Sequence, residues 1–221
     1  HGLGTKPMMI WMRNNSDNYN WDNWHWGLGA ISNTMMFNQA GGSVNNRTPF
    51  TTTEPTDSVF SVRDGFFTDN EDMVAYCFTA VPGFSAMGSY RPAQTPGSAQ
   101  KPYIHTGFQP RFVLIKNTGA PSANGDWIVV DRDRAWGGGI GDTNNTTMSR
   151  RNTDSNERLE MNTSNSTDAD GRTSGGNGVQ ITSNGFRIDA ANWNELNAEL
   201  SSNSYIWYAI AEFPTKYSSG R

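Results

Sequence analysis

The stretch HGLGTKPMMIWMRN (residues 1–14) returns later in the chain as HTGFQPRFVLIKN (residues 105–117). In both stretches a histidine and a glycine precede a proline, an apolar run follows, and a basic residue with an asparagine ends the run. A short apolar run between turn-forming residues is typical of a buried β-strand. Its return with the same flanking residues predicts a fold built from two copies of one unit.

Further blocks repeat in the same order. Asn20-Trp21 parallels Asp126-Trp127, and the next matched pairs of segments are residues 60–62 with 186–188, and 74–78 with 206–210, with Pro82 falling on Pro214. Four blocks in one order are poorly explained by chance. The repeat predicts a first unit over residues 1–90, a proline-rich linker over 91–104, and a longer second unit over 105–221.

The repeat also bears on why the sequence begins with a histidine. His105 holds the place of His1 but is joined by a peptide bond to Ile104, so this position does not require a free amino group. We therefore expect His1 to be the start of a repeat unit, in a fragment, a processed product or part of a longer chain.

The apolar runs predict an all-β fold. FVLIK (residues 112–116), WIVVDR (127–132), MVAYCF (73–78) and YIWYAIAEF (205–213) have the composition of central strands. Asn184-Gly185 and Asp64-Gly65 are turn signals of the kind found in hairpins. The segment WNELNAEL (193–200) is a weak helix candidate. We expect two homologous β-sandwich-like units in tandem, or one continuous sandwich built from the two halves.

Composition limits the partners. The net charge is −4, and Lys and Arg form no cluster, so the chain lacks the basic face that binding to nucleic acid needs. No apolar run approaches the length that spans a membrane, so no membrane insertion is expected. Cys77, the only cysteine, lies in MVAYCF and is expected to be a buried structural thiol.

Motifs for catalysis or metal binding are missing from the sequence. It has no G-x-S-x-G and no H-E-x-x-H motif. The segment DADG (168–171) matches only the first part of a calcium loop, without the later acidic ligand. The sequence therefore predicts no enzyme, no metal and no cofactor. A third-ranked alternative is a copper-dependent polysaccharide monooxygenase, in which His1 would bind copper with His25 or His105.

Tryptophans are the candidate contact residues. In NWDNWHWGLG (residues 20–29) strand alternation places Trp24 and Trp26 on one face and His25 on the other. Trp21 matches Trp127 of the second copy and is assigned to the core. Residues found in only one copy are free to bind, and exposed aromatic rings suit sugars and protein partners. The candidates for a ligand or partner contact are Trp24, Trp26, Trp136 and Trp193, with a place in the core or in a subunit interface as the alternative.

The motifs together resemble a known family. Their order is H-G-L-G-x-x-P, W-x-x-W-H-x-x-L-G, Y-C-F-x-x-V-x-G-x-S-x-x-G-S-Y, H-T-G-F-x-P-x-F-V-x-I-K, S-N-G-F and A-E-x-P-x-K-Y-S, at residues 1–7, 21–29, 76–90, 105–116, 183–186 and 211–218. This order resembles a repeat domain of unknown function found in virion structural and tail-fibre proteins of tailed bacteriophages, mainly marine and cyanobacterial ones. The polar insert of the second copy and the aromatic segment 24–26 depart from that pattern.

The resemblance implies a structural and adhesive role and no active site. It implies a position at the virion surface, in the exposed receptor-binding part of a tail fibre or spike. The implied partners are other virion proteins and a glycan or protein of the host surface. A homo-oligomer is expected, and a trimer is the guess from how phage fibres are usually built. The alternative is a capsid-decoration or head-fibre protein, whose partner would be the phage shell.

Overall fold

The predicted all-β fold is confirmed. The computed structural model describes residues 1–16, 20–39, 42, 49–66, 70–92, 102–119, 125–131, 159–161, 179–188, 196 and 204–213. Within these ranges the elements are β1 (Met9–Asn14), β2 (Asp22–His25), the 3₁₀ turn η1 (Trp26–Leu28), β3 (Met35–Met36), β4 (Met73–Phe78), β5 (Ser85–Tyr90), β6 (Tyr103–His105), β7 (Pro110–Asn117), β8 (Trp127–Asp131), β9 (Leu159–Glu160), β10 (Val179–Thr182), β11 (Gly185–Ile188) and β12 (Tyr205–Ala211).

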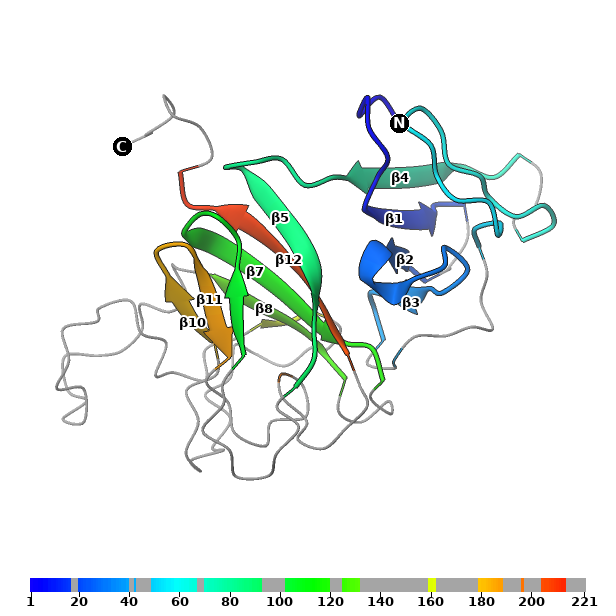
Figure 1. The fold of residues 1–221 in the computed structure, drawn as a ribbon. Coiled ribbons are helices and arrows are strands. Elements are labelled where there is room, and N and C mark those ends of the chain that lie inside the picture. Colours follow the sequence, from blue (N-terminus) through cyan, green and yellow to red (C-terminus); the bar gives the residue numbers. More distant parts are fainter. Residues whose placement is uncertain are drawn as a thin grey trace, which may run out of the picture.

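The strands form three antiparallel sheets. The strand orders are β3-β2-β1-β4, β5-β12-β7-β8-β9 and β10-β11-β6. Figure 1 shows the four-stranded sheet on one side of the molecule and the other two sheets together on the opposite side. Apart from β5, the strands within residues 1–90 build the first sheet, and the strands from residue 103 onward build the other two.

The repeated blocks of sequence occupy corresponding places in the two larger sheets. β1 lies between β2 and β4, and β7 lies between β8 and β12. The registers also correspond, because Met12 pairs with Asp22 as Ile115 pairs with Ile128. On the other side of the central strand, residues 14 and 73 pair as residues 117 and 205 do.

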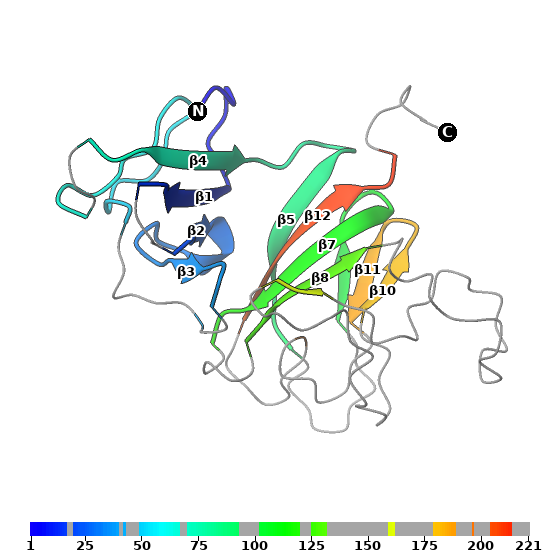
Figure 2. The same ribbon diagram turned by 180° about the vertical axis from the view of Figure 1, so that it is seen from behind.

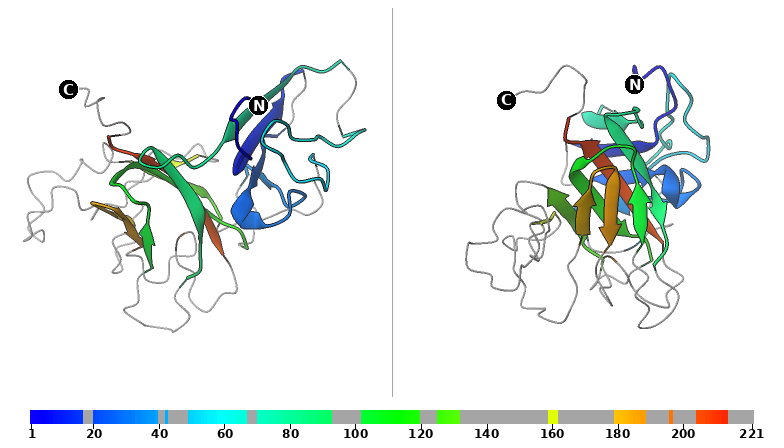
Figure 3. Two further views of the ribbon diagram at one scale, coloured as in Figure 1. Left: turned by 45° about the horizontal axis from the view of Figure 1, so that its top comes forward. Right: turned by 60° about the vertical axis from the view of Figure 1, so that its left-hand side comes forward.

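β5 crosses from the first half of the chain to the second. It lies within residues 1–90, yet it pairs along its whole length with β12, from Tyr205 opposite Tyr90 to Ile210 opposite Ser85. Figures 2 and 3 show the chain passing from β4 of the four-stranded sheet into β5 at the edge of the five-stranded sheet. Hydrogen bonds of the second sheet therefore cross the predicted boundary near residue 90. The division into two tandem units stays a prediction.

The buried apolar residues form three clusters. One lies between the two large sheets, and the other two lie on the opposite faces of those sheets. The central cluster joins the four-stranded and five-stranded sheets through residues such as Met9, Leu114 and Tyr208. A second cluster lies between the five-stranded and three-stranded sheets and contains Val113 and Ile115. Neighbouring residues of β7 thus enter different clusters, and burial of both faces explains its unbroken apolar run.

The prediction that MVAYCF is a central strand is wrong. This segment is β4, the edge strand of its sheet, and Met73, Ala75 and Tyr76 are exposed. Cys77 is half-buried rather than buried. An apolar run indicates a strand but carries no information about whether a neighbour lies on each side of it.

The two glycine turn signals mark real turns. Asn184-Gly185 lies at the β10–β11 hairpin, where Thr182 pairs with Gly185. A side chain on Gly185 would collide with the carbonyl oxygen of Ile104 on β6, so a close approach of two strands requires glycine here. Gly65 has a φ of 69°, a left-handed conformation that glycine adopts without strain.

The weak helix candidate lies almost entirely outside the described residues. Of residues 193–200, only Leu196 is described, and it is buried in the cluster between the five-stranded and three-stranded sheets.

Candidate functional site

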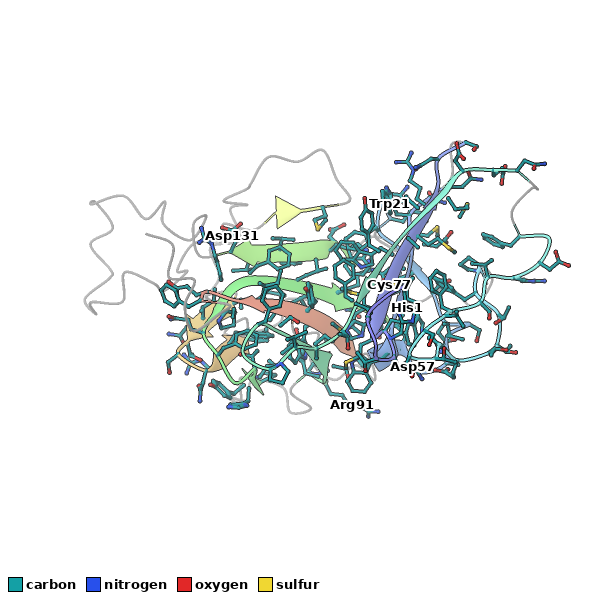
Figure 4. The ribbon with its side chains drawn as sticks, turned by 90° about the horizontal axis from the view of Figure 1, so that it is seen from above. His1, Trp21, Asp57, Cys77, Arg91 and Asp131 are labelled. Carbon is teal, nitrogen blue, oxygen red and sulfur yellow. The ribbon has the colours of Figure 1, made fainter. Side chains whose placement is uncertain are left out.

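The candidate site is an aromatic pocket at the side of the central cluster, where the four-stranded and five-stranded sheets meet. Its volume is about 480 Å³. Its lining residues are Trp11, Trp21, Phe37, Asn38, Tyr76, Phe78 and Met161. Figure 4 places Trp21 near the boundary of the two sheets.

The base of the pocket comes from two neighbouring strands. Trp11 of β1 pairs directly with Tyr76 of β4, so their side chains share one face of the sheet. The Trp11 ring packs against Phe37 and Phe78, with ring centroids 4.6 Å away in each case. This packing fixes the orientation of the Trp11 indole ring and leaves Tyr76 at the mouth.

Two rings and one cation form the rim. Trp21 and Tyr76 stack with centroids 6.2 Å apart and ring planes 25° from parallel. The Arg13 guanidinium lies 5.6 Å from the centre of the Trp21 ring, a favourable cation–π position. Tyr76 is 50% exposed, so one large apolar side chain of the pocket faces solvent.

Hydrogen bonds hold the segment that carries Trp21. The Trp21 N–H donates to Oδ1 of Asn38 at 3.2 Å, and the Phe37 N–H donates to the Trp21 carbonyl oxygen at 2.9 Å. The Asn38 amide nitrogen also donates to Oδ1 of Asn20 at 2.7 Å. An amide can make four hydrogen bonds, so Asn38 keeps one N–H and one lone pair for a further partner.

Trp24 is corrected from a candidate contact residue to a core residue. It is 1% exposed and packs in the third cluster with Ile10, Met12 and Phe50. The expected alternation of Trp24 and Trp26 also fails, because β2 ends at His25 and the chain turns into η1. Strand alternation does not extend past the end of a strand.

The other predicted contact residues have different outcomes. Trp26 is 43% exposed and lies beside His25, but it does not line the pocket. Trp136 and Trp193 lie outside the described residues. A contact through Trp26 therefore stays a prediction, separate from the pocket.

His25 is a buried link between the sheets. Its Nδ1 accepts from the Gly27 N–H at 3.0 Å, and its Nε2 donates to the Trp207 carbonyl oxygen of β12 at 3.2 Å. Burial lowers the pKa of His25 to about 4, partly offset by the hydrogen bond to Trp207. The ring is therefore neutral at pH 7, with both nitrogens engaged.

His1 also forms hydrogen bonds with other residues of the chain. Its amino group donates to the Ser58 carbonyl oxygen at 3.1 Å, and its ring bonds to Thr56 and Leu3. Figure 4 shows His1 on the side of the molecule where Asp57 lies. Within the described ranges, no three His, Cys, Asp or Glu residues are grouped for a metal ion. The hydrogen bonds of His1 and His25 give no support to a copper site shared by these two residues.

Sequence reasoning missed the pocket because its residues match the second half. Trp21 and Tyr76 correspond to Trp127 and Tyr208, which are 1% and 6% exposed. Phe37 covers Trp127, with stacked rings 4.2 Å apart. Equivalent positions thus differ in exposure because only one of them is covered by another part of the chain.

The comparisons with known proteins identify a family and no function. No curated protein and no solved structure matches the chain. Among the residues that the structure describes, no helix has the length and apolar character needed to cross a membrane. One family model covers residues 1–214, which is nearly the whole sequence. The chain therefore belongs to the family described as "Domain of unknown function (DUF7483)".

Proposed function

We propose that this chain is a non-catalytic binding domain at the surface of a phage virion, in the exposed part of a tail fibre or spike. Its aromatic pocket holds a sugar ring of a host-surface glycan. The single observation that carries the binding proposal is the open pocket of about 480 Å³ lined by Trp11, Trp21 and Tyr76. The placement on a virion rests on the order of sequence motifs and on their resemblance to virion repeat domains.

The chemistry of the pocket suits a sugar. The face of a pyranose ring is apolar and packs on flat aromatic rings, while its hydroxyl groups need polar partners at the edge. Trp21 and Tyr76 supply the rings, and Tyr76 is half-exposed. Asn38 has spare hydrogen-bonding capacity beside them, and Arg13 adds a charged donor near Trp21.

The test compares the pocket with a tryptophan outside it. Tyr76→Ala and Trp21→Ala each remove a ring from the rim, and Trp26→Ala removes an exposed ring elsewhere. Loss of one anchor typically costs about 1–3 kcal/mol, so we expect the two pocket variants to bind host cells and host glycans about 5- to 150-fold more weakly. Trp26→Ala distinguishes the two predicted contacts: it binds like the wild type if the pocket holds the ligand, and more weakly if Trp26 does.

Thermal unfolding separates loss of binding from loss of folding. Tyr76 is half-exposed, so Tyr76→Ala should change the melting temperature little. Unchanged binding by both pocket variants would rule the pocket out as the glycan site. Weaker binding by Trp26→Ala alone would move the site to the segment that includes Trp26.

A further inference from the structure

The outer edge of β4 is an open strand edge of a kind that proteins usually protect. β4 has no neighbour beyond it among the described residues. Its sequence MVAYCF has six residues without charge or proline. Exposed edges are normally blunted by lysine, proline, bulges or a covering segment, because unpaired backbone groups recruit another strand. β4 contains neither lysine nor proline.

The hydrogen-bonding pattern shows which backbone groups of β4 point outward. The Asn15 N–H donates to the Asp72 carbonyl oxygen at 2.8 Å, beside the β1–β4 ladder. In an antiparallel ladder alternate residues bond to the same neighbour. Val74 and Tyr76 therefore bond to β1, and the N–H and C=O groups of Met73, Ala75 and Cys77 face away from it.

The second half of the chain shows what this edge can accept. β12 corresponds to β4, because both pair with their central strand in the same register. The outer edge of β12 is covered by β5, which runs antiparallel with Ala209 opposite Ala86. Cys77 and Ala209 hold equivalent positions in the two strands. The same strand position is thus paired in one half and open in the other.

We propose that β4 pairs in antiparallel fashion with β4 of a second copy of this chain, forming a two-fold symmetric dimer. Every copy carries the same open edge, and two identical antiparallel strands are complementary to each other. An uncharged strand also brings no like charges together when it meets itself. The dimer joins two four-stranded sheets into one continuous sheet.

The outward-facing groups set the register. When Ala75 lies opposite Ala75 of the partner subunit, Met73 lies opposite Cys77 of the partner subunit, and all these pairs fall within β4. The two-fold axis is perpendicular to the sheet, so each face of one copy continues into the same face of the other. The two aromatic pockets then open on the same side of the dimer.

The test uses charge at the symmetry axis. Ala75→Glu and Ala75→Lys each place like charges opposite one another in the dimer, while an equimolar mixture places Glu opposite Lys. We expect the wild-type chain to sediment as a dimer and each variant to self-associate about fivefold more weakly or worse. The mixture should restore a heterodimer. Val59→Glu and Val59→Lys are the controls, because Val59 is 58% exposed and lies outside β4.

A cross-link tests the register independently. Opposite residues of a hydrogen-bonded antiparallel pair have Cα atoms about 5.5 Å apart, within the range for a disulfide. Ala75→Cys in a Cys77→Ser background should therefore oxidise to a covalent dimer, and Val59→Cys in the same background should not. A monomeric or trimeric wild-type chain would overturn the proposal. Variants at Ala75 that associate like the wild type, or an Ala75→Cys chain that does not cross-link, would do so as well.

Discussion

At the scale of single residues, His25 is the clearest case of a polar side chain with a structural task. It lies in β2 of the first half and donates to Trp207 in β12 of the second half. It is 1% exposed and lies where the two large sheets pack together. Lys116 is a second link of this kind, because its ammonium group donates to the carbonyl oxygen of Gln39 at 3.3 Å.

The burial of His25 predicts a loss of stability in mild acid. Its pKa is about 4 in the folded chain against an ordinary value of 6.5. Between these two pH values the unfolded chain binds a proton that the folded chain does not, so the free energy of unfolding falls as the pH falls from about 6.5 to about 4. The shift corresponds to about 3 kcal/mol at full protonation.

Denaturant unfolding at a series of pH values measures this loss. His25→Gln removes the titrating ring and should flatten the dependence between about pH 6.5 and 4. His105→Gln replaces an exposed histidine and is the control. An equal acid dependence in the wild type and in His25→Gln would show that another group causes it.

At the scale of elements, the β5–β12 pairing depends on one glycine. A Cβ atom on Gly88 would lie 2.8 Å from Cζ2 of Trp207, so the indole ring lies directly over this position. Trp207 also packs edge-to-face on Phe186 of β11, with centroids 5.5 Å apart. The ring therefore connects the edge strand to the three-stranded sheet.

Replacement of this glycine should disturb the second half of the molecule. Gly88→Ala forces the Trp207 ring to move in a packed core, and such overpacking typically costs about 1–3 kcal/mol. We expect a lower melting temperature and a changed tryptophan fluorescence. Ser89→Ala, at the exposed residue next to Gly88 in the same strand, is the control and should change neither. An unchanged stability of Gly88→Ala would mean that Trp207 has room to shift.

At the scale of the whole molecule, the two large sheets meet through equivalent faces. Phe37 follows β3 and donates to the Trp21 carbonyl oxygen at 2.9 Å, as Met161 follows β9 and donates to the Trp127 carbonyl oxygen at 3.0 Å. Phe37 stacks on Trp127 of the opposite sheet, whereas Met161 lines the pocket beside Trp21. The pocket thus occupies the place that corresponds to the Phe37–Trp127 stack.

This correspondence predicts that a larger residue at 161 closes the pocket. Met161→Phe places a ring where it can pack on Trp21, as Phe37 packs on Trp127. We expect glycan and cell binding to fall about tenfold or more, which is the effect expected when one anchoring side chain is removed. Thermal stability should not fall. Met161→Leu keeps a flexible side chain and is the control. Full binding by Met161→Phe would place the ligand elsewhere or show that the phenylalanine points to solvent.

Local sequence patterns were sufficient to predict the all-β fold class. Apolar runs such as FVLIK and YIWYAIAEF became β7 and β12, and Asn184-Gly185 marked a hairpin, because strand and turn preferences arise from nearest neighbours along the chain. The matched segments also occupy corresponding positions beside the two central strands. Residues 74–78 and 206–210 both form the strand that pairs with a central strand.

The tertiary structure alone decided which equivalent residues are exposed. Trp21 and Trp127 match in sequence, yet Trp127 is buried under Phe37 of the opposite sheet, whereas Trp21 is half-buried and lines the pocket. β4 and β12 match as well, yet only β12 has β5 on its outer side. Exposure depends on contacts between segments far apart in the chain, and no local pattern records them. The sequence by itself therefore determined the strands, and sheet packing determined the pocket and the open edge.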